Sequence, residues 1–242
     1  MLGLRVDRNR RGLTEVLCLG AHSDDIEIGC GGTILELIAS NPGLRVVWVV
    51  FSAHGQREKE ARRGASHFLK GARATEVILR KQRDGFFPAQ LTEIKEFFEE
   101  LKGTTAPDLI FTHYRFDRHQ DHRTVSDLTW NTFRDHFVLE YEVPKYDGDL
   151  GIPNVFVPIG RRLARRKVNH LCAVFETQRR QHWFTPDLFF GLMRLRGIEC
   201  VGESGFAEAF HARKAVLDTR PLRPRKVERA RALERGRTLR SR

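Results

Sequence analysis

The sequence predicts an α/β fold in which a mostly parallel sheet is flanked by helices. Between Glu15 and about Phe137, short apolar runs alternate with longer amphipathic stretches, a pattern typical of repeated βαβ units. The apolar runs are nearly continuous, as expected of parallel strands that are buried on both faces. The 242 residues, 40% of them hydrophobic, suit one large domain whose core needs no disulfide or structural metal. Together these observations indicate a Rossmann-like layered fold.

The first half of the chain contains four predicted strands and four predicted helices. The strands are expected at 16–19, 45–51, 76–79 and 108–112. The first helix is expected to begin near Gly31-Gly32-Thr33 and to end before Asn41-Pro42-Gly43, where Gly and Pro stop it. The next helices should span 57–69, follow Pro88 as far as Gly103, and begin near Asp121.

Beyond Tyr141 the pattern is weaker. Residues 143–149 have the composition of a loop, and the segments 167–178 and 186–196 have helical spacing. No further strand is predicted there, and the order of the strands in the sheet is left open.

Most of the excess positive charge lies at the C-terminal end. Residues 220–242 hold ten Lys or Arg and two Glu, so they account for +8 of the net charge of +11. We therefore expect one folded domain over 1–219 and a flexible basic tail over 220–242. Because the domain itself is nearly balanced in charge, a nucleic-acid partner is not expected, although contact of the tail with an anionic surface stays an alternative.

The sequence indicates neither a targeting segment nor a redox-active cysteine pair. The longest apolar runs are far shorter than the ~20 residues that span a bilayer, and residues 1–12 lack the apolar stretch of a secretory signal. The four cysteines form no Cys-x-x-Cys pair and are expected to be structural, acting as small hydrophobes. We expect a cytoplasmic protein without a transmembrane segment.

Two clusters of imidazoles and carboxylates follow predicted strands. His22-Ser23-Asp24-Asp25-Ile26-Glu27 comes after the first strand, and Asp117-Arg118-His119-Gln120-Asp121-His122 comes after the fourth. In a doubly wound sheet both segments border the crevice at the carboxyl ends of the strands. Crowded carboxylates at that place need a cation or strongly shifted pKa values. Imidazole and carboxylate donors without a thiolate favour Zn²⁺ in an open catalytic site, with Fe²⁺ or another divalent ion as the alternative.

Other motifs are set aside. Gly29-Cys30-Gly31-Gly32 resembles a dinucleotide-binding loop, but Ile34 stands where that fingerprint needs Gly, so the glycines are expected to permit a tight turn and close helix packing. Six other histidines are interpreted as ordinary core or surface residues: His54, His67, His136, His170, His182 and His211.

His22-Ser23-Asp24-Asp25 together with His119-x-x-His122 resembles the PIG-L, or LmbE-like, family of zinc-dependent N-deacetylases. Ser23 replaces the usual Pro of the first motif, which removes a backbone restraint but no ligand. The similarity spans 15–215 and includes four further motifs: Arg57-x-x-Glu60, Asp84-Gly85, Thr177-Gln178 and Ala207-Glu208-Ala209-Phe210. It implies that the folded domain over 1–219 is a deacetylase domain.

The resemblance implies a division of roles within the two clusters. His22, Asp25 and His122 would ligate the metal, and Asp24 would remain free as the general base. His119, protonated, would stand beside the metal and donate to the developing oxyanion. This division fits general chemistry, because a bound Zn²⁺ lowers the pKa of water to about 7 and so permits a carboxylate to accept its proton.

The resemblance also implies that Arg57 and Asp84 contact substrate hydroxyls or phosphate. As an alternative, Arg57 and Glu60 form an exposed ion pair three residues apart on a helix. Three more acids are expected to orient the histidines or cap the following helix rather than to react: Glu27, Asp117 and Asp121.

The implied reaction is metal-dependent removal of an N-acetyl group from a small N-acetylated amino sugar, such as an N-acetylglucosamine derivative, or from a glycoconjugate. An amidase that acts on a sugar–thiol conjugate would share the same metal site. A binding protein with a structural metal and a functional basic tail is the alternative from a different class.

Overall fold

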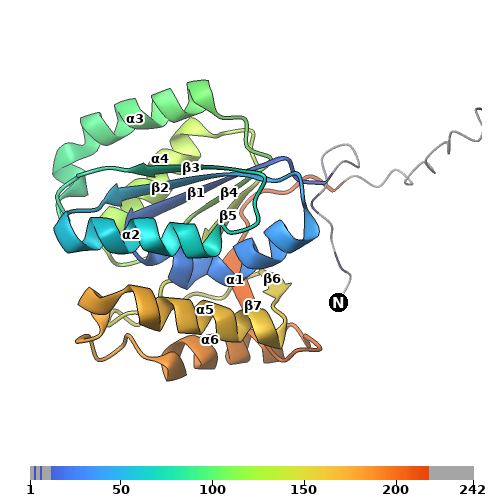
Figure 1. Cartoon of the computed structure of the whole chain (residues 1–242). Coiled ribbons are helices and arrows are strands. Elements are labelled where there is room, and N and C mark those ends of the chain that lie inside the picture. Colours follow the sequence, from blue (N-terminus) through green and yellow to red (C-terminus); the bar gives the residue numbers. More distant parts are fainter. Residues whose placement is uncertain (1–2, 4–5, 7–11, 218–242) are drawn as a thin grey trace, which may run out of the picture.

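The computed structural model describes residues 3, 6 and 12–217, and within them seven strands form one sheet. The strands are β1 (Glu15–His22), β2 (Arg45–Ser52), β3 (Ala74–Leu79), β4 (Leu109–His113), β5 (Val138–Tyr141), β6 (Val155–Pro158) and β7 (Ala207–His211). Their order is β3-β2-β1-β4-β5-β7-β6, and β7 runs antiparallel to both of its neighbours while β1 to β5 pair in parallel (Figure 1). The predicted mostly parallel α/β sheet is confirmed.

Helices cover both faces of the sheet. They are α1 (Asp25–Ser40), α2 (Gly55–Phe68), α3 (Leu91–Thr104), α4 (Gln120–Thr132), α5 (Arg161–Val174) and α6 (Pro186–Glu199), with short 3₁₀ turns at Phe87–Gln90 and Glu176–Gln178. Figure 1 shows α3 and α4 on one face and α1 and α2 on the other. α5 packs on α1 and α2, and α6 packs on α5 and β7. None of these helices combines the length and the apolar character needed to cross a membrane.

The core lies on both sides of β1, which explains its continuous apolar run. Leu17 and Leu19 pack toward α3 and α4, whereas Val16 and Cys18 pack toward the layer of α1, α2 and α5. All four side chains are almost completely buried. Successive residues of a strand point to opposite faces, so a strand between two helical layers needs apolar residues at nearly every position.

The three strands at the far side of the sheet were not predicted. Each has only four or five residues, and β5 and β7 carry the buried acids Glu140 and Glu208 in their centres. These acids interrupt the apolar pattern, but they have buried partners: Glu140 accepts a hydrogen bond from Trp130 Nε1 at 2.6 Å, and Glu208 accepts one from Lys167 Nζ at 2.5 Å. Tertiary pairing therefore overrides the local signal.

The predicted start of α1 near Gly31 is wrong, because the helix begins at Asp25. Glycine disfavours a helix interior, yet here close packing requires it: a Cβ on Gly29 would lie 2.1 Å from the ring of Tyr141. The glycines thus serve helix packing, as predicted, and not a tight turn. Within α1 the N–H of Gly32 donates to Glu208 at 2.8 Å, and the carbonyl of Ile28, its usual helical partner, accepts from Lys167 at 2.5 Å.

Most of the other predicted helices begin closer to their observed first residues. α2, α3, α4 and α6 begin within about two residues of the expected positions. α5 begins at Arg161, six residues before the predicted helix, because a run of outward-facing arginines precedes its buried residues Ala164, Val168 and Leu171. The four cysteines are free, as expected. The predicted tail over 220–242 lies outside the described residues.

Candidate metal centre

The two predicted clusters meet at the point where the sheet reverses its strand order. From β1 the chain continues to β2 and β3 on one side, whereas β4 and β5 lie on the other side of β1. His22 is the last residue of β1, Asp24 and Asp25 open α1, and His119 and His122 lie at the start of α4. The crevice beside such a switch point is where open α/β sheets bind ligands.

His22, Asp25 and His122 bring three ligand atoms together. His22 Nδ1 lies 3.2 Å from His122 Nε2 and 3.3 Å from Asp25 Oδ2, and His122 Nε2 lies 3.4 Å from Asp25 Oδ1. All three residues are buried. Tetrahedral zinc with bonds of about 2.0–2.1 Å places its ligand atoms about 3.4 Å apart. The donor set and its spacing therefore fit a four-coordinate divalent ion with three protein ligands.

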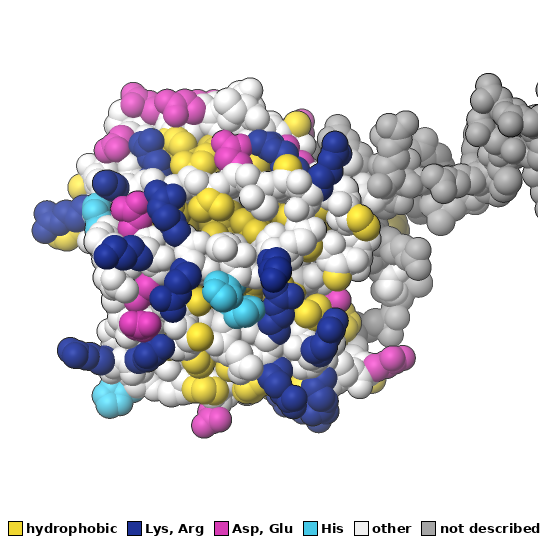
Figure 2. Space-filling view, in the orientation of Figure 1, with side chains coloured by type: hydrophobic (Ala, Val, Ile, Leu, Met, Phe, Trp, Pro, Cys, Tyr) yellow, Lys and Arg dark blue, Asp and Glu magenta, His cyan; other side chains and the backbone are white. Residues whose placement is uncertain are grey.

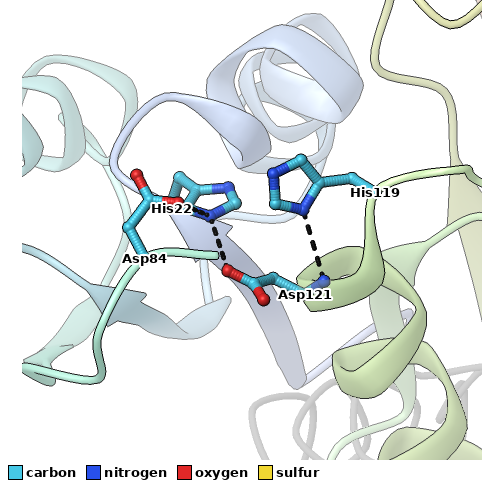
Figure 3. A group of neighbouring side chains, drawn as sticks. All are labelled: His22, Asp84, His119 and Asp121. Atoms are coloured by element: carbon cyan, nitrogen blue, oxygen red, sulfur yellow. Dashed lines mark hydrogen bonds and ion pairs between the residues drawn. The ribbon is translucent and has the colours of Figure 1, made fainter. Parts of the chain in front are cut away.

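Carboxylates contact the ring nitrogens of His22 and His122 that face away from the group of ligand atoms. His122 Nδ1 lies 2.9 Å from Asp117 Oδ2. His22 Nε2 lies 3.2 Å from Asp121 Oδ2 and 3.0 Å from Asp84 Oδ1 (Figure 3). Each ring therefore directs its N–H at an acid and its lone pair at the other histidine. Two lone pairs that face each other at 3.2 Å need a cation or a proton between them. This arrangement is typical of histidines that ligate a metal.

Asp117 and Asp121 make contacts of the expected kind with the histidines, with one change of partner. Asp117 holds His122, and its Oδ1 accepts the backbone N–H of His119 at 2.8 Å. Asp121 holds His22, which comes from the other cluster. Its carboxylate also accepts the backbone N–H groups of Gly85 at 2.6 Å and Phe87 at 3.0 Å. Asp121 thereby ties the loop after β3 to the site.

Asp24 stays outside the group of three ligand atoms. Its Oδ1 accepts a hydrogen bond from Arg57 Nη2 at 2.6 Å. Burial raises the pKa of Asp24, and the Arg57 guanidinium opposes that rise. The alternative of an exposed Arg57–Glu60 pair is wrong, because Glu60 is buried and accepts from the backbone N–H and the hydroxyl of Thr177 at 3.0 and 2.6 Å.

His119 caps the N-terminus of α4 and lies beside both histidines of the group. Its Nδ1 accepts the backbone N–H of Asp121 at 3.2 Å, and its ring centroid lies 4.8 Å from that of His22 and 4.7 Å from that of His122. Burial and the two neighbouring imidazoles lower the pKa of His119. While Nδ1 accepts this hydrogen bond, Nε2 is the ring nitrogen that can donate.

The sequence did not single out His113 and Tyr141. His113 ends β4, its Nε2 accepts the backbone N–H of Ala21 at 2.9 Å and lies 3.3 Å from Asp25 Oδ2, and its ring stacks on His122 at 3.9 Å. Burial and His122 lower the pKa of His113 to about 4. The Tyr141 hydroxyl lies 3.2 Å from the same nitrogen. The available signal was a histidine directly after a predicted strand, at the same sheet edge as His22.

Glu27 is buried beneath the two aspartates without a polar partner. Neither carboxylate oxygen has a hydrogen-bond partner among the described residues, and a Cβ on Gly64 would lie 2.3 Å from Oε1. Burial raises the pKa of Glu27 well above its ordinary value, and the carboxylates of Asp24 and Asp25 add to the rise. Glu27 therefore orients no histidine, in contrast to the prediction.

Replacement of Glu27 by Gln is expected to remove a pH-dependent loss of stability. Because the folded chain holds this proton more tightly than the unfolded chain, the stabilisation is complete below about pH 4.3 and declines as pH rises toward the folded-state pKa. Relative to the parent, the variant should gain up to about 1.4 kcal/mol per pH unit in that window. Urea unfolding of chelator-treated protein at several pH values measures the difference. Glu100→Gln, at an exposed position, is the control, and parallel pH profiles for parent and Glu27→Gln would contradict the prediction.

Solved structures share the fold. N,N'-diacetylchitobiose deacetylase from Pyrococcus horikoshii aligns with a TM-score of 0.63 at 19% identity, over 83% of this chain and 84% of its own. The conserved protein TT1542 from Thermus thermophilus has a TM-score of 0.65 at 20% identity, over 87% and 99%. GalB, a 4-carboxy-2-hydroxymuconate hydratase from Pseudomonas putida KT2440, has a TM-score of 0.64 at 15% identity, over 86% and 100%.

Sequence comparisons point to one family. The uncharacterized deacetylase YaiS of Escherichia coli K12 is 28% identical over 142 residues, which cover 53% of this chain and 74% of that protein. Residues 17–133 match the PIG-L family, described as GlcNAc-PI de-N-acetylase. The matched region contains both clusters and every candidate site residue named from the sequence. Both sequence comparisons therefore show similarity to PIG-L deacetylases, and the family match extends over residues 17–133.

Proposed function

We propose that this protein is a metal-dependent hydrolase that removes the N-acetyl group from an N-acetylated amino sugar or glycoconjugate. The observation that carries the proposal is the convergence of His22, Asp25 and His122 beside an Asp24 carboxylate that belongs to none of their contacts. The family match over the same residues supports it, as does the N,N'-diacetylchitobiose deacetylase among the structural neighbours.

His22, Asp25 and His122 would hold the ion. Two imidazoles and one carboxylate suit Zn²⁺, with Fe²⁺ or another divalent metal as the alternative. Such an ion, when bound, polarises a carbonyl and lowers the pKa of water to about 7. Asp117 and Asp121 keep the two imidazoles in the tautomers that leave the converging nitrogens unprotonated.

The chain's own groups then move the protons. Asp24 accepts a proton from the attacking water and delivers it to the departing amine. Arg57 fixes the orientation of that carboxylate through its 2.6 Å hydrogen bond. His119 donates from Nε2 to the oxyanion that develops on the acetamide oxygen, an effect of roughly 3 kcal/mol for a well-placed donor. Asp84 is mostly exposed beside His22, so it remains available to a substrate hydroxyl.

Metal analysis combined with acetate release tests the proposal. The purified protein is expected to hold about one divalent ion per chain and to release acetate from at least one member of a panel of N-acetylated sugars. Chelation should abolish the release, and zinc should restore it. Activity that survives complete removal of the metal would sink the mechanism. A sugar–thiol conjugate in the same panel distinguishes the amidase alternative.

Removal of 220–242 separates the enzyme from the binding-protein alternative. A deacetylase whose site lies within 17–133 should keep its turnover without these residues. A binding protein that relies on the basic tail should instead lose an affinity for polyanions that falls steeply with salt. Loss of acetate release on removal of the tail would contradict the proposed assignment of catalysis to the described site.

Replacement of Asp117 by Asn is expected to weaken metal binding about 10- to 100-fold. The neutral amide still reaches His122 Nδ1 but makes the imidazole less basic and holds its tautomer less firmly. Competition with a chromophoric chelator measures the affinity. The matched control is Asp149→Asn, because Asp149 shares the Lys145 contact with Asp117 but does not touch His122. Equal affinities of parent and Asp117→Asn would refute this role.

A further inference from the structure

A pocket of about 750 Å³ lies between α5 and the C-terminal end of α2, away from the candidate metal centre. Its lining consists of Ser66, His67, Lys70, Gly71, Arg166 and His170. The opposite end of α2 carries Arg57, which contacts Asp24. Because a helix rises 1.5 Å per residue, about 15 Å of α2 separates Arg57 from the pocket. The pocket is therefore distinct from the candidate metal centre.

The pocket combines two cationic side chains and two imidazoles and contains no acidic residue. Arg166 donates from Nε to His170 Nε2 at 3.1 Å and from Nη2 to the backbone carbonyl of His67 at 3.1 Å. The His67 and His170 rings lie 4.6 Å apart, and Lys70 is exposed at the rim. Among the described residues no Asp or Glu oxygen lies within 4.0 Å of the side-chain nitrogens of these four residues. Elsewhere buried cations are paired, as Lys167 is with Glu208.

The local field is positive. Burial, His67 and Arg166 together lower the pKa of His170 to about 4, and no carboxylate counteracts them. Figure 2 shows Lys and Arg side chains gathered around histidines over α2 and α5 on this face. On the same face Arg62 pairs with Glu58, but within the pocket no acid neutralises the charges of Arg166 and Lys70. Such a concave region of one sign attracts a small ion of the opposite sign.

We propose that this pocket binds the phosphate group of a small phosphorylated molecule. A phosphate accepts several hydrogen bonds at once, which matches the Arg166 guanidinium, the Lys70 ammonium, the imidazole N–H groups and the Ser66 hydroxyl. Four of the six lining residues are exposed, so the pocket is open to solvent and a phosphate group can reach it. The competing explanation is purely structural: Arg166 caps the last turn of α2 and Lys70 is an ordinary surface residue.

Calorimetric titration of the full chain with inorganic phosphate at constant ionic strength tests the proposal. We expect saturable binding that Lys70→Ala weakens about 5- to 10-fold. Lys70 makes no contact that the fold needs, so this variant should fold normally. The matched control, Arg165→Ala, removes an exposed charge of α5 outside the pocket and should bind as the parent does. Bound phosphate should also raise the pKa of the His170 ring, which NMR follows directly.

Three results would overturn the proposal. They are the absence of saturable phosphate binding, equal binding by Lys70→Ala and the parent, and equal losses in Lys70→Ala and Arg165→Ala, which would indicate diffuse charge. His122→Ala, which disables the proposed metal centre, should keep phosphate affinity, so a failure of the proposed deacetylase function does not affect this test. Vesicles of phosphatidic acid form the second arm, because binding to vesicles without binding to free phosphate would mean a membrane-facing surface and would refute a small-molecule site.

Discussion

Replacement of Asp24 by Asn is expected to lower the rate of acetate release by about 10²- to 10⁴-fold while the metal stays bound. Asn keeps the shape of Asp24 and can still accept the hydrogen bond from Arg57 Nη2, so the fold around the site should persist. The amide, however, accepts no proton from water at neutral pH. Steady-state acetate release and metal content, measured on the same preparation, give the two numbers that the prediction needs.

The neighbouring aspartate supplies the matched control. Asp25 has oxygens within 3.4 Å of both His22 and His122, whereas Asp24 contacts Arg57. Asp25→Asn should therefore lose metal and activity together, and Asp24→Asn should lose activity alone. Near-normal turnover of Asp24→Asn with metal bound, or full metal content in Asp25→Asn, would exclude the proposed division of roles.

The positions of these residues were predictable because they depend on the most regular part of the fold. The first cluster begins at the last residue of β1 and the second lies four residues beyond the end of β4, so the crevice at the strand ends could be placed from the apolar pattern. The contacts within the crevice were less predictable. Asp121 contacts His22, which lies about a hundred residues earlier in the chain, and nothing in the local sequence indicates that contact. His113 was missed for a similar reason, since its partners Ala21, in β1, and Asp25, at the start of α1, lie about ninety residues earlier in the chain.

The strands β5, β6 and β7 were unpredictable for a different reason. β5 and β7 have buried acids at central positions, which local patterns treat as evidence against a strand. Only the folded chain shows that Lys167 and Trp130 satisfy those acids. The predicted start of α1 was wrong for a related reason, since its glycines serve close packing against Tyr141, Phe68 and Glu208 within the helix. Where a tertiary contact replaces a local rule, the sequence signal points the wrong way.

The fold alone does not select the reaction. Proteins of this fold include a deacetylase from Pyrococcus horikoshii and a hydratase from Pseudomonas putida, at similar TM-scores of 0.63 and 0.64. Both similarities are below 20% identity and concern the backbone. The proposed deacetylase activity therefore depends on the family match over residues 17–133 and on the arrangement of side chains at the switch point. Metal content, proton transfer and substrate range therefore need separate measurements.

The largest loss of stability is expected from Glu208→Gln, far from the chemistry. Glu208 accepts hydrogen bonds from Lys167 Nζ at 2.5 Å, Gly32 N–H at 2.8 Å and Thr33 N–H at 2.6 Å, and it joins β7 to α5 and α1. Both Lys167 and Glu208 are at most 4% exposed. Gln leaves the Lys167 charge buried without a counter-ion, which costs about 3–5 kcal/mol. Thermal unfolding should therefore begin about 10 °C lower.

A double variant distinguishes an unpaired charge from general damage to the core. If the cost comes from the charge of Lys167, then adding Lys167→Met to Glu208→Gln should recover part of the lost stability, because a buried cation without a partner is worse than an apolar side chain of similar length. Glu99→Gln, which breaks the exposed pair with Lys95, should leave the unfolding temperature unchanged. Strictly additive losses in the double variant would show that each side chain contributes through packing alone. The ion pair would then not be what holds β7 against α1 and α5.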